Sequence, residues 1–353
     1  MCLRKSLLAK IKFQTTYHAI ESIQFQYMQM MKPVVTLLIL LLKLILILTP
    51  LHALAKNWIL PPNDVDIFGE IQITAANHEE TLLDIARHHE IGQDEILLAN
   101  PNVNRWLPEQ GAEVVIPSRY ILPQAPRSGL VINLPEMRLY YFPKAIKDNK
   151  PRIITYPVSI GRMDWKTPLG KTTIIRKQKD PTWTPPQSLR NEAMANEGKI
   201  LPAVVPAGPD NPLGRYALYL GLPGYLIHST NKPFGVGMRV THGCIRMYPE
   251  NIEELFAIIP VSTPVYIVNQ PIKLGWLEKN LYIELHPPLE EDSTDADPTL
   301  YIQEAYAAVQ SFLQKTGGLP DEESIPSIQI DQTALDEAIE RMDGIPTLIS
   351  IEQ

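Results

Sequence analysis

The stretch Thr241-His242-Gly243-Cys244-Ile245-Arg246 places a cysteine between basic residues, sixteen positions after His228. The chain has 353 residues and only two cysteines, Cys2 and Cys244. Cysteines of exported proteins usually pair into disulfides, so a cysteine without a partner in such a protein indicates a free, reactive thiol. If Cys2 is removed during export, Cys244 is the residue around which a functional site is expected.

Residues 30–55 have the pattern of a secretory signal peptide. Lys32 supplies the positive start, Val34 to Leu48 the apolar core, and Ala53-Leu54-Ala55 a small-residue cleavage site. The alternative is an uncleaved membrane anchor. However, the segment is short for a membrane span, and Lys43 within it would cost about 2.5–3.5 kcal/mol. We therefore predict cleavage after Ala55 and an exported mature protein.

Residues 1–29 fit no part of this signal, because they are mixed polar and apolar and precede its positive start. We expect translation to begin at Met30 or Met31, which makes residues 1–29 an over-extended N-terminus. In either case Cys2 lies before the predicted cleavage site and would be absent from the mature protein.

A small unit at residues 71–118 follows a predicted linker at residues 56–70. Its expected elements are a strand at 71–74, a helix capped by Thr81, a helix at 93–99 and a strand at 113–117. This βααβ order in so few residues leaves no room for a large catalytic cleft. One interpretation is a small packing domain without a ligand.

The same unit resembles a LysM module. The resemblance is carried by Glu80-Thr81-Leu82-Leu83-Asp84-Ile85-Ala86, by Ile96-Leu97-Leu98-Ala99-Asn100-Pro101 and by Val114-Val115-Ile116-Pro117. It implies binding to the N-acetylglucosamine-containing backbone of peptidoglycan or chitin. Such modules can also remain folded after losing their affinity for glycan, so the packing alternative stays open.

A mainly β domain with few helices is expected at residues 127–269, after a Pro-containing linker at 119–126. Apolar runs and turn residues predict strands at 130–134, 138–142, 153–160, 171–177, 216–220, 225–228 and 265–268, and a helix at 249–259. The fold class is therefore a β-rich domain preceded by the small βααβ domain.

Residues 270–353 form a C-terminal extension of different character. A strand is expected at 281–285, then an acidic linker at 287–298 and amphipathic helices at 300–313 and 332–342. The formal net charge of the chain is −7, and the acidic excess lies entirely from Pro287 onward, because the residues before it are basic on balance. We interpret the acidic tail from Pro287 as a solvated extension without catalytic residues, and the alternative is a flexible arm that docks a partner. We expect no nucleic-acid partner.

A thiol attacks as its thiolate, so the environment must lower the pKa of Cys244 or supply a base. His228 ends an apolar strand from which its imidazole can face a nucleophile on a neighbouring segment. His242 lies two residues from Cys244 and would point to the same side on an extended backbone. Gly243 permits a tight turn and Arg246 adds fixed positive charge.

Two other interpretations of these residues remain open. Cys244, His228 and His242 have the residue types of a Cys-His₂ zinc site completed by water. The expected fourth ligand or water-activating carboxylate is missing nearby in the sequence, because Glu250 is assigned to the start of a helix. The second alternative is an inert, buried cysteine, which the adjacent glycine and charges disfavour.

Residues 127–268 resemble the catalytic domain of an L,D-transpeptidase of the YkuD type. The family signature is a histidine followed, after a spacer, by Ser/Thr-His-Gly-Cys and then Arg or Asn. Here these are His228 and residues 241–246, with supporting matches at Thr167-Pro168-Leu169-Gly170, Pro181 to Pro186 and Asn211-Pro212-Leu213-Gly214. One departure is Ser229, where many members have glycine.

The resemblance implies a role for each signature residue. Cys244 is the nucleophile, and His228 accepts its proton while the Ser229 carbonyl orients the imidazole. The backbone N–H groups of His242, Gly243 and Cys244 form an oxyanion hole, and Arg246 holds the charged substrate or the loop. No metal or other cofactor is implied.

The implied reaction is a two-step acyl transfer on peptidoglycan. Cys244 attacks the carbonyl of the third residue of a tetrapeptide stem and releases the terminal D-alanine. The acyl group then passes from the cysteine to an amine. A second stem gives a 3→3 cross-link, a lysine of an outer-membrane lipoprotein gives a wall anchor, and water gives a carboxypeptidase. A wall-binding protein with a vestigial catalytic domain is a further alternative.

Overall fold

The computed structural model describes residues 57–144, 150–292, 298–316 and 328–351. All of them belong to one structural unit, Ala53–Gln353. The predicted signal peptide and the expected over-extended N-terminus lie outside the described residues. Within the described ranges, no helix combines the length and the apolar character needed to cross a membrane.

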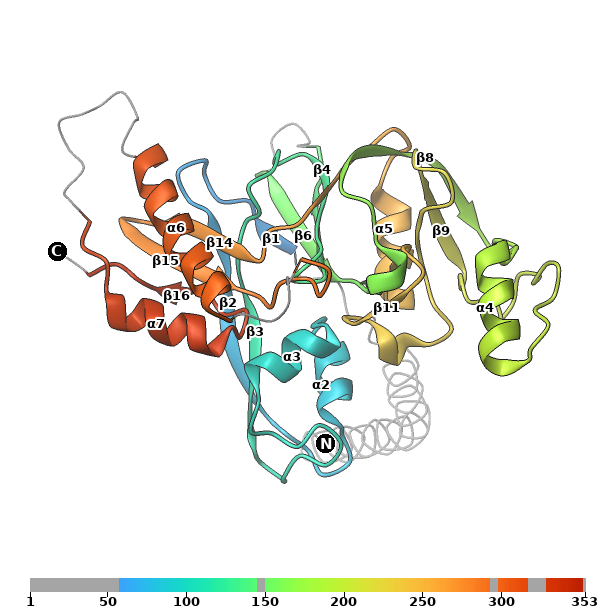
Figure 1. Cartoon of the computed structure of the whole chain (residues 1–353), viewed down its shortest axis with the longest axis horizontal. Helices are drawn as coiled ribbons and strands as arrows, with labels where there is room; N and C mark the ends of the chain where they lie inside the picture. The colour runs from blue at the N-terminus through green and yellow to red at the C-terminus, as the bar shows by residue number, and fades with distance from the viewer. Residues whose placement is uncertain (1–56, 145–149, 293–297, 317–327, 352–353) are drawn as a thin grey trace, which may run out of the picture. The chain divides into compact units, whose positions relative to one another are not determined.

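Nine strands of the described residues form one curled, mixed sheet (Figure 1). Its order is β1 (Asn57–Ile59), β6 (Arg152–Pro157), β5 (Arg138–Phe142), β4 (Gly129–Asn133), β13 (Pro264–Val268), β8 (Gly170–Lys179), β9 (Tyr216–Leu220), β10 (Leu226–His228) and β12 (Ile245–Arg246). The β4–β13 and β10–β12 pairs are parallel, and the other pairs are antiparallel. The prediction of a mainly β domain is confirmed.

Both faces of the central strands are covered, which explains their nearly unbroken apolar runs. All five residues of β4 are buried. Leu130 and Ile132 belong to the main core, whereas Val131 packs in a second core on the opposite face. Helix α5 (Pro249–Ile258) closes the main core with two apolar side chains, Ile252 and Leu255, which are fully buried.

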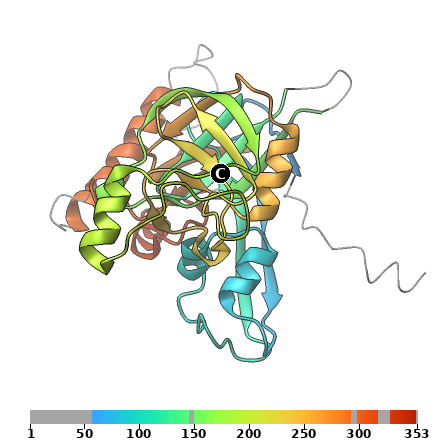
Figure 2. The same ribbon diagram turned by 90° about the vertical axis from the view of Figure 1, so that its right-hand side faces the viewer.

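The small N-terminal unit has the expected order of strand, helix, helix and strand. Its elements are β2 (Ile67–Ala75), α2 (Leu82–His88), α3 (Gln93–Ala99) and β3 (Glu113–Ile121). Thr81 caps α2 through a capping box with Asp84. Figure 2 shows the helices beside the β2–β3 ribbon, and apolar residues of both helices pack against Val114 and Ile116 of β3.

The two strands of this ribbon are longer than the sequence predicts. They pair from Ile67↔Ile121 to Ala75↔Glu113, so regular structure extends into both predicted linkers. The stretch 56–70 also contains β1, which pairs with β6 at the edge of the large sheet. Tertiary packing explains the extra length of the ribbon, because Phe68 and Tyr120 pack against Tyr140 of the large sheet.

Helices α2 and α3 contact the β-rich domain through backbone and charged groups. The N–H groups of Gln93 and Asp94 donate to the carbonyls of Val236 and Gly237, each at 3.0 Å. Gly237 is required at this contact, since a Cβ there would lie 2.2 Å from the Gln93 nitrogen.

A bidentate ion pair joins Arg87 of α2 to Glu250 of α5, with distances of 2.8 and 3.0 Å. Glu250 does lie in the first turn of α5, as predicted. It therefore serves both the helix start and the contact between the two parts of the chain.

The C-terminal part is a packed α/β layer, so its interpretation as a solvated extension is wrong. Strands β14 (Ile272–Leu277), β15 (Asn280–Leu285) and β16 (Thr347–Leu348) form a sheet, on which α6 (Pro298–Thr316) and α7 (Gln332–Arg341) pack (Figure 1). The predicted strand and both helices are present. Sequence reasoning missed β14, because Lys273 and Gly275 interrupt its apolar pattern.

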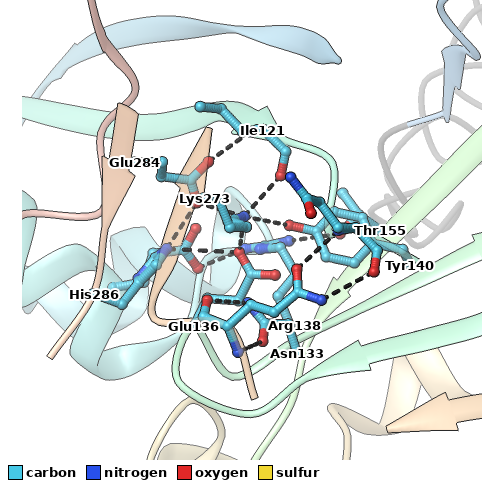
Figure 3. Close-up of polar contacts among 12 residues, drawn as sticks. Ile121, Asn133, Glu136, Arg138, Tyr140, Thr155, Lys273, Glu284 and His286 are labelled. Carbon is cyan, nitrogen blue, oxygen red and sulfur yellow. Dashed lines mark hydrogen bonds and ion pairs between the residues drawn. The ribbon is translucent and has the colours of Figure 1, made fainter. Parts of the chain in front are cut away.

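A buried cluster of charged groups lies where the three parts of the chain meet (Figure 3). The Lys273 ammonium of β14 contacts Glu136 of the β4–β5 turn, lies 2.6 Å from Glu284 of β15 and donates to the Ile121 carbonyl at 2.8 Å. His286 Nε2 lies 2.7 Å from Glu284.

Burial sets the protonation of this cluster, because it raises the pKa values of Glu136 and Glu284 and lowers that of His286 to about 4. These three residues have the donor set of a metal site. The ammonium of Lys273 lies between the two carboxylates, so the chain itself supplies their cation.

Candidate active site

The edge of the large sheet brings the predicted site residues together. β10 ends at His228, and β12 begins at Ile245, directly after Cys244. The two strands are parallel, with Ile227 opposite Ile245 and His228 opposite Arg246. In this parallel register Cys244 lies beside Leu226, two residues before His228, although the two segments are separated in the sequence.

The backbone turns sharply between His242 and Cys244. Gly243 has a φ of +94°, and a Cβ at this position would lie 2.8 Å from the Tyr225 ring. The turn is held by the Thr241 hydroxyl, which donates to the Cys244 carbonyl at 2.6 Å and accepts from the Gly243 N–H at 3.2 Å. The backbone here is therefore turned rather than extended, as Gly243 permits, and glycine is needed for its conformation.

A second hydroxyl supports the same turn from the segment after β7 (Ile160–Gly161). Thr167 donates to the Gly243 carbonyl at 3.0 Å and accepts from the Gly161 N–H at 3.0 Å. Thr167 belongs to the Thr-Pro-Leu-Gly match that supported the family resemblance. Its contact explains why this stretch accompanies the cysteine motif.

His228 is a buried, neutral imidazole. Its Nδ1 lies 2.5 Å from the Ser229 carbonyl, which can only accept, so we assign the proton to Nδ1 and leave Nε2 unprotonated. Burial, helped by the nearby charge of Arg246, lowers the pKa of His228 to about 3. His228 is therefore a free base throughout the neutral range.

Cys244 is a free thiol at a half-buried position. Its Sγ lies 3.7 Å from the Gly224 carbonyl. Burial raises the pKa of Cys244, although a backbone hydrogen bond at Leu226 and the charge of Arg246 act in the opposite direction. The thiol therefore stays protonated at neutral pH.

Arg246 contributes fixed charge beside this pair. Burial lowers its pKa, and its Nε has no hydrogen-bond partner among the described residues. A buried guanidinium with an unused donor is suited to hold an anionic group of a substrate.

One acidic residue at the site could not be predicted from the sequence. Glu192 of α4 (Gln187–Glu197) accepts a hydrogen bond from His242 Nε2 at 2.9 Å and also contacts Arg162. The Trp165 ring lies on His242, with centroids 5.2 Å apart. Glu192 is fifty positions from His242 and matches no motif, so only the fold reveals this contact.

The contacts of both histidines bear on the zinc alternative. His228 Nδ1 is engaged by Ser229, and His242 Nε2 by Glu192. Among the described residues, Glu136, Glu284 and His286 offer three close metal-ligand atoms. This group does not include Cys244. An unpaired thiol near an imidazole oriented by a carbonyl is instead suited to nucleophilic attack on a carbonyl group, the chemistry of acyl transfer and hydrolysis.

Comparison with known proteins agrees with this class of chemistry. A family model described as the L,D-transpeptidase catalytic domain, YkuD, matches residues 127–267. "Probable L,D-transpeptidase YbiS" of Escherichia coli K12 is 37% identical over 302 residues, 84% of this chain and 93% of that protein. "Probable L,D-transpeptidase YcfS" of the same strain is 41% identical over 269 residues, 74% and 82% of the two chains.

Among solved structures, L,D-transpeptidase 3 from Mycobacterium tuberculosis matches 46% of this chain and 73% of that chain, with 16% identity and a TM-score of 0.30. The long matches to the Escherichia coli proteins show the family. This chain belongs to the L,D-transpeptidases, which are acyltransferase enzymes.

Proposed function

We propose that this enzyme is a periplasmic L,D-transpeptidase that acts on peptidoglycan stem peptides through a thioester on Cys244. The observation that carries the proposal is the neutral His228, fixed by the Ser229 carbonyl at the sheet edge where the turn places Cys244. Membership of the family supplies the reaction class, and the predicted signal peptide supplies the compartment.

The first half-reaction forms the thioester. His228 Nε2 takes the thiol proton as the Cys244 sulfur attacks the carbonyl of the third stem residue. The resulting oxyanion is held by the backbone N–H groups of His242 and Cys244, because the Gly243 N–H donates to the Thr241 hydroxyl. The C–N bond to D-alanine then breaks, and His228 returns the proton to the departing amine.

The second half-reaction transfers the acyl group. An incoming amine loses a proton to His228 and attacks the thioester carbonyl. The new C–N amide bond forms as the C–S bond breaks, and His228 gives its proton to the departing sulfur, which re-forms the thiol. The acceptor is a second stem peptide, giving a 3→3 cross-link, or a lysine of an outer-membrane lipoprotein, giving a wall anchor. With water as acceptor, the same steps make a carboxypeptidase.

Digestion of purified murein by the mature protein tests this proposal, alone and with a candidate lipoprotein, with products identified by mass spectrometry. New amide bonds would establish a transpeptidase and identify its acceptor, whereas loss of D-alanine alone would establish a carboxypeptidase. C244A should stop both reactions and keep the fold. Full turnover by C244A would refute the assignment of the nucleophile. A cellular phenotype of C244A equal to that of wild type would favour the alternative of a wall-binding protein with a vestigial catalytic domain.

We also propose that residues 71–118 are a LysM module that binds glycan strands. In support, Trp106 is 63% exposed beside the similarly exposed Leu107, on the loop between α3 and β3. An exposed indole can stack on the apolar face of a sugar ring. W106A should therefore reduce co-sedimentation with murein sacculi, and binding equal to that of wild type would leave a packing role for this unit.

The remaining domain assignments are proposals of the same kind: a signal peptide at 30–55, a catalytic domain at 127–269 and a C-terminal part at 270–353. The N-terminal sequence of the exported protein tests the first of these. Lys56 as the first residue is expected, and a retained residue 30–55 segment would instead indicate an anchor.

A further inference from the structure

The segment between β15 and α6 contacts the catalytic domain. We call residues 287–292 the strap. Leu289 of the strap is 6% exposed and belongs to the main core, together with residues of β4 and α5. Asp292 accepts a hydrogen bond from the Asn269 side chain at 2.5 Å. The strap is therefore held against the catalytic domain by an apolar anchor and a polar one.

The strap also forms a shielded ion pair with the catalytic domain. Glu291 Oε2 lies 2.6 Å from Arg239 Nη2, and the two side chains are only 9% and 16% exposed. Arg239 Nε donates to the Gly161 carbonyl at 3.3 Å. Because both charges are largely removed from water, loss of either partner leaves the other poorly solvated.

Arg239 stands at the start of the strand that leads to the nucleophile. β11 (Arg239–Thr241) pairs in parallel with β7, with Arg239 opposite Ile160 and Thr241 opposite Gly161. Thr241 then holds the turn through the Cys244 carbonyl and the Gly243 N–H. A continuous series of contacts thus joins Glu291 to the backbone of Cys244.

We propose that Glu291 is a positioning residue, through which the C-terminal part holds Arg239, β11 and the Cys244 turn in reactive geometry. The proposal rests on the function proposed above and assigns a role to a part of the chain that carries no site residue of its own. Glu291 acts through Arg239 and need not touch the substrate.

The test compares E291Q with E290Q in the full mature protein. Glutamine keeps the shape of Glu291 and removes its charge. We expect E291Q to lower kcat for D-alanine release by about 10- to 100-fold, the cost of a misplaced reacting group, while KM stays close to that of wild type. Glu290 is the matched control, since its side chain is 71% exposed and 3.8 Å from Arg239. E290Q should keep the wild-type kcat.

A second measurement does not depend on the substrate. Alkylation of Cys244 by iodoacetamide at neutral pH should slow in E291Q, because a displaced turn moves the thiol away from its base, and should be unchanged in E290Q. R239Q should show the same defect as E291Q, and the R239Q/E291Q double variant should lose no more than either single one. E291D keeps the negative charge and should recover part of the alkylation rate. If E291Q does not fold, E291D provides the variant for the same measurement.

Equal kcat and equal alkylation rates in E291Q and wild type would overturn the proposal, as would additive losses in the double variant. If the wild-type protein released no D-alanine, the proposed function would fail. The alkylation rates of the same variants would still decide the role of Glu291.

Discussion

At the scale of single residues, the free enzyme holds a neutral thiol and a neutral imidazole. Burial disfavours the charged forms of both groups and outweighs the pull of Arg246 on Cys244. In the proposed mechanism the proton therefore moves to His228 during the attack itself, and no thiolate–imidazolium pair forms beforehand. This picture has consequences for the pH dependence of activity and of stability.

The first consequence concerns the acid limb of the rate. His228 must be unprotonated to act as a base, and its pKa is about 3. We therefore expect kcat/KM for the first half-reaction to show no decline at the ordinary histidine value near 6.5, and to fall only far below it. A pH–rate profile over the range in which circular dichroism shows a folded protein tests this, and a half-maximal rate near pH 6.5 would contradict it.

The second consequence concerns the free energy of unfolding. The folded-state pKa of His228 lies below its unfolded value of about 6.5, so its stabilising contribution is complete above pH 6.5 and is lost as the pH falls toward 3. The loss is about 1.4 kcal/mol for each pH unit below 6.5. H228Q, which cannot titrate, provides the reference.

Urea unfolding of both proteins at pH 7 and pH 5 measures this contribution. Between pH 7 and pH 5, the free energy of unfolding of wild type should fall by about 2 kcal/mol more than that of H228Q. The other buried groups titrate in both proteins, so their contribution cancels in this comparison. Parallel behaviour of the two proteins would show that His228 titrates normally in the folded state.

At the scale of elements, α4 is linked to the nucleophile loop by polar contacts rather than by a core. None of its residues is buried, yet Glu192 binds both His242 and Arg162. These hydrogen bonds lower the pKa of Glu192, the one from Arg162 most strongly. The side chain is partly shielded, with 24% of its surface exposed, so solvent still screens its charge and its influence should be moderate.

E192Q is accordingly expected to reduce kcat/KM by about two- to fivefold, the range of a partly exposed charged pair. E197Q, at the exposed end of the same helix, is the matched control and should behave like wild type. Steady-state kinetics of D-alanine release on the two variants measure the effect. A loss of a hundredfold or more in E192Q would show that Glu192 has a direct part in the chemistry.

At the scale of the whole molecule, the buried cluster at Lys273 joins the β2–β3 ribbon, the catalytic domain and the C-terminal sheet. The ammonium, 1% exposed, faces two carboxylates that are 2% and 0% exposed. Removal of one partner from a buried charged group is costly, because the remaining charge has neither water nor a counterion. We expect these parts to unfold in one transition.

K273M tests this expectation and should lower the free energy of unfolding by about 3–5 kcal/mol. K279M is the control, because Lys279 is an exposed lysine in the β14–β15 turn. It should change the stability by less than about 0.5 kcal/mol. Thermal denaturation followed by circular dichroism and tryptophan fluorescence should give coincident curves for wild type, and a normal stability of K273M would exclude a coupling role for the cluster.

Much of the fold follows from patterns that are local in the sequence. Apolar runs bounded by turn residues predicted most strands of the large sheet, and Thr81 marked the start of α2. The cysteine motif and His228 identified the family, and the fold brings the two to the same sheet edge. Their exact roles remain proposals.

Other features depend on side chains that meet only after folding. β14 was missed because Lys273 is polar, and its burial is explained by Glu136 and Glu284 from other segments. The long β2–β3 ribbon results from packing against Tyr140, and the ordered C-terminal part from its own core.

The sequence by itself determined the family, the candidate nucleophile and its base, and the succession of elements. The tertiary structure alone decided which charges meet: Glu192 with His242, Glu291 with Arg239, and Lys273 with its two glutamates. The physical reason is that propensity, capping and apolar periodicity act over a few residues and leave their pattern in the sequence. A charged residue far along the chain has a partner only when packing removes both from water, and its local sequence carries no sign of that partner.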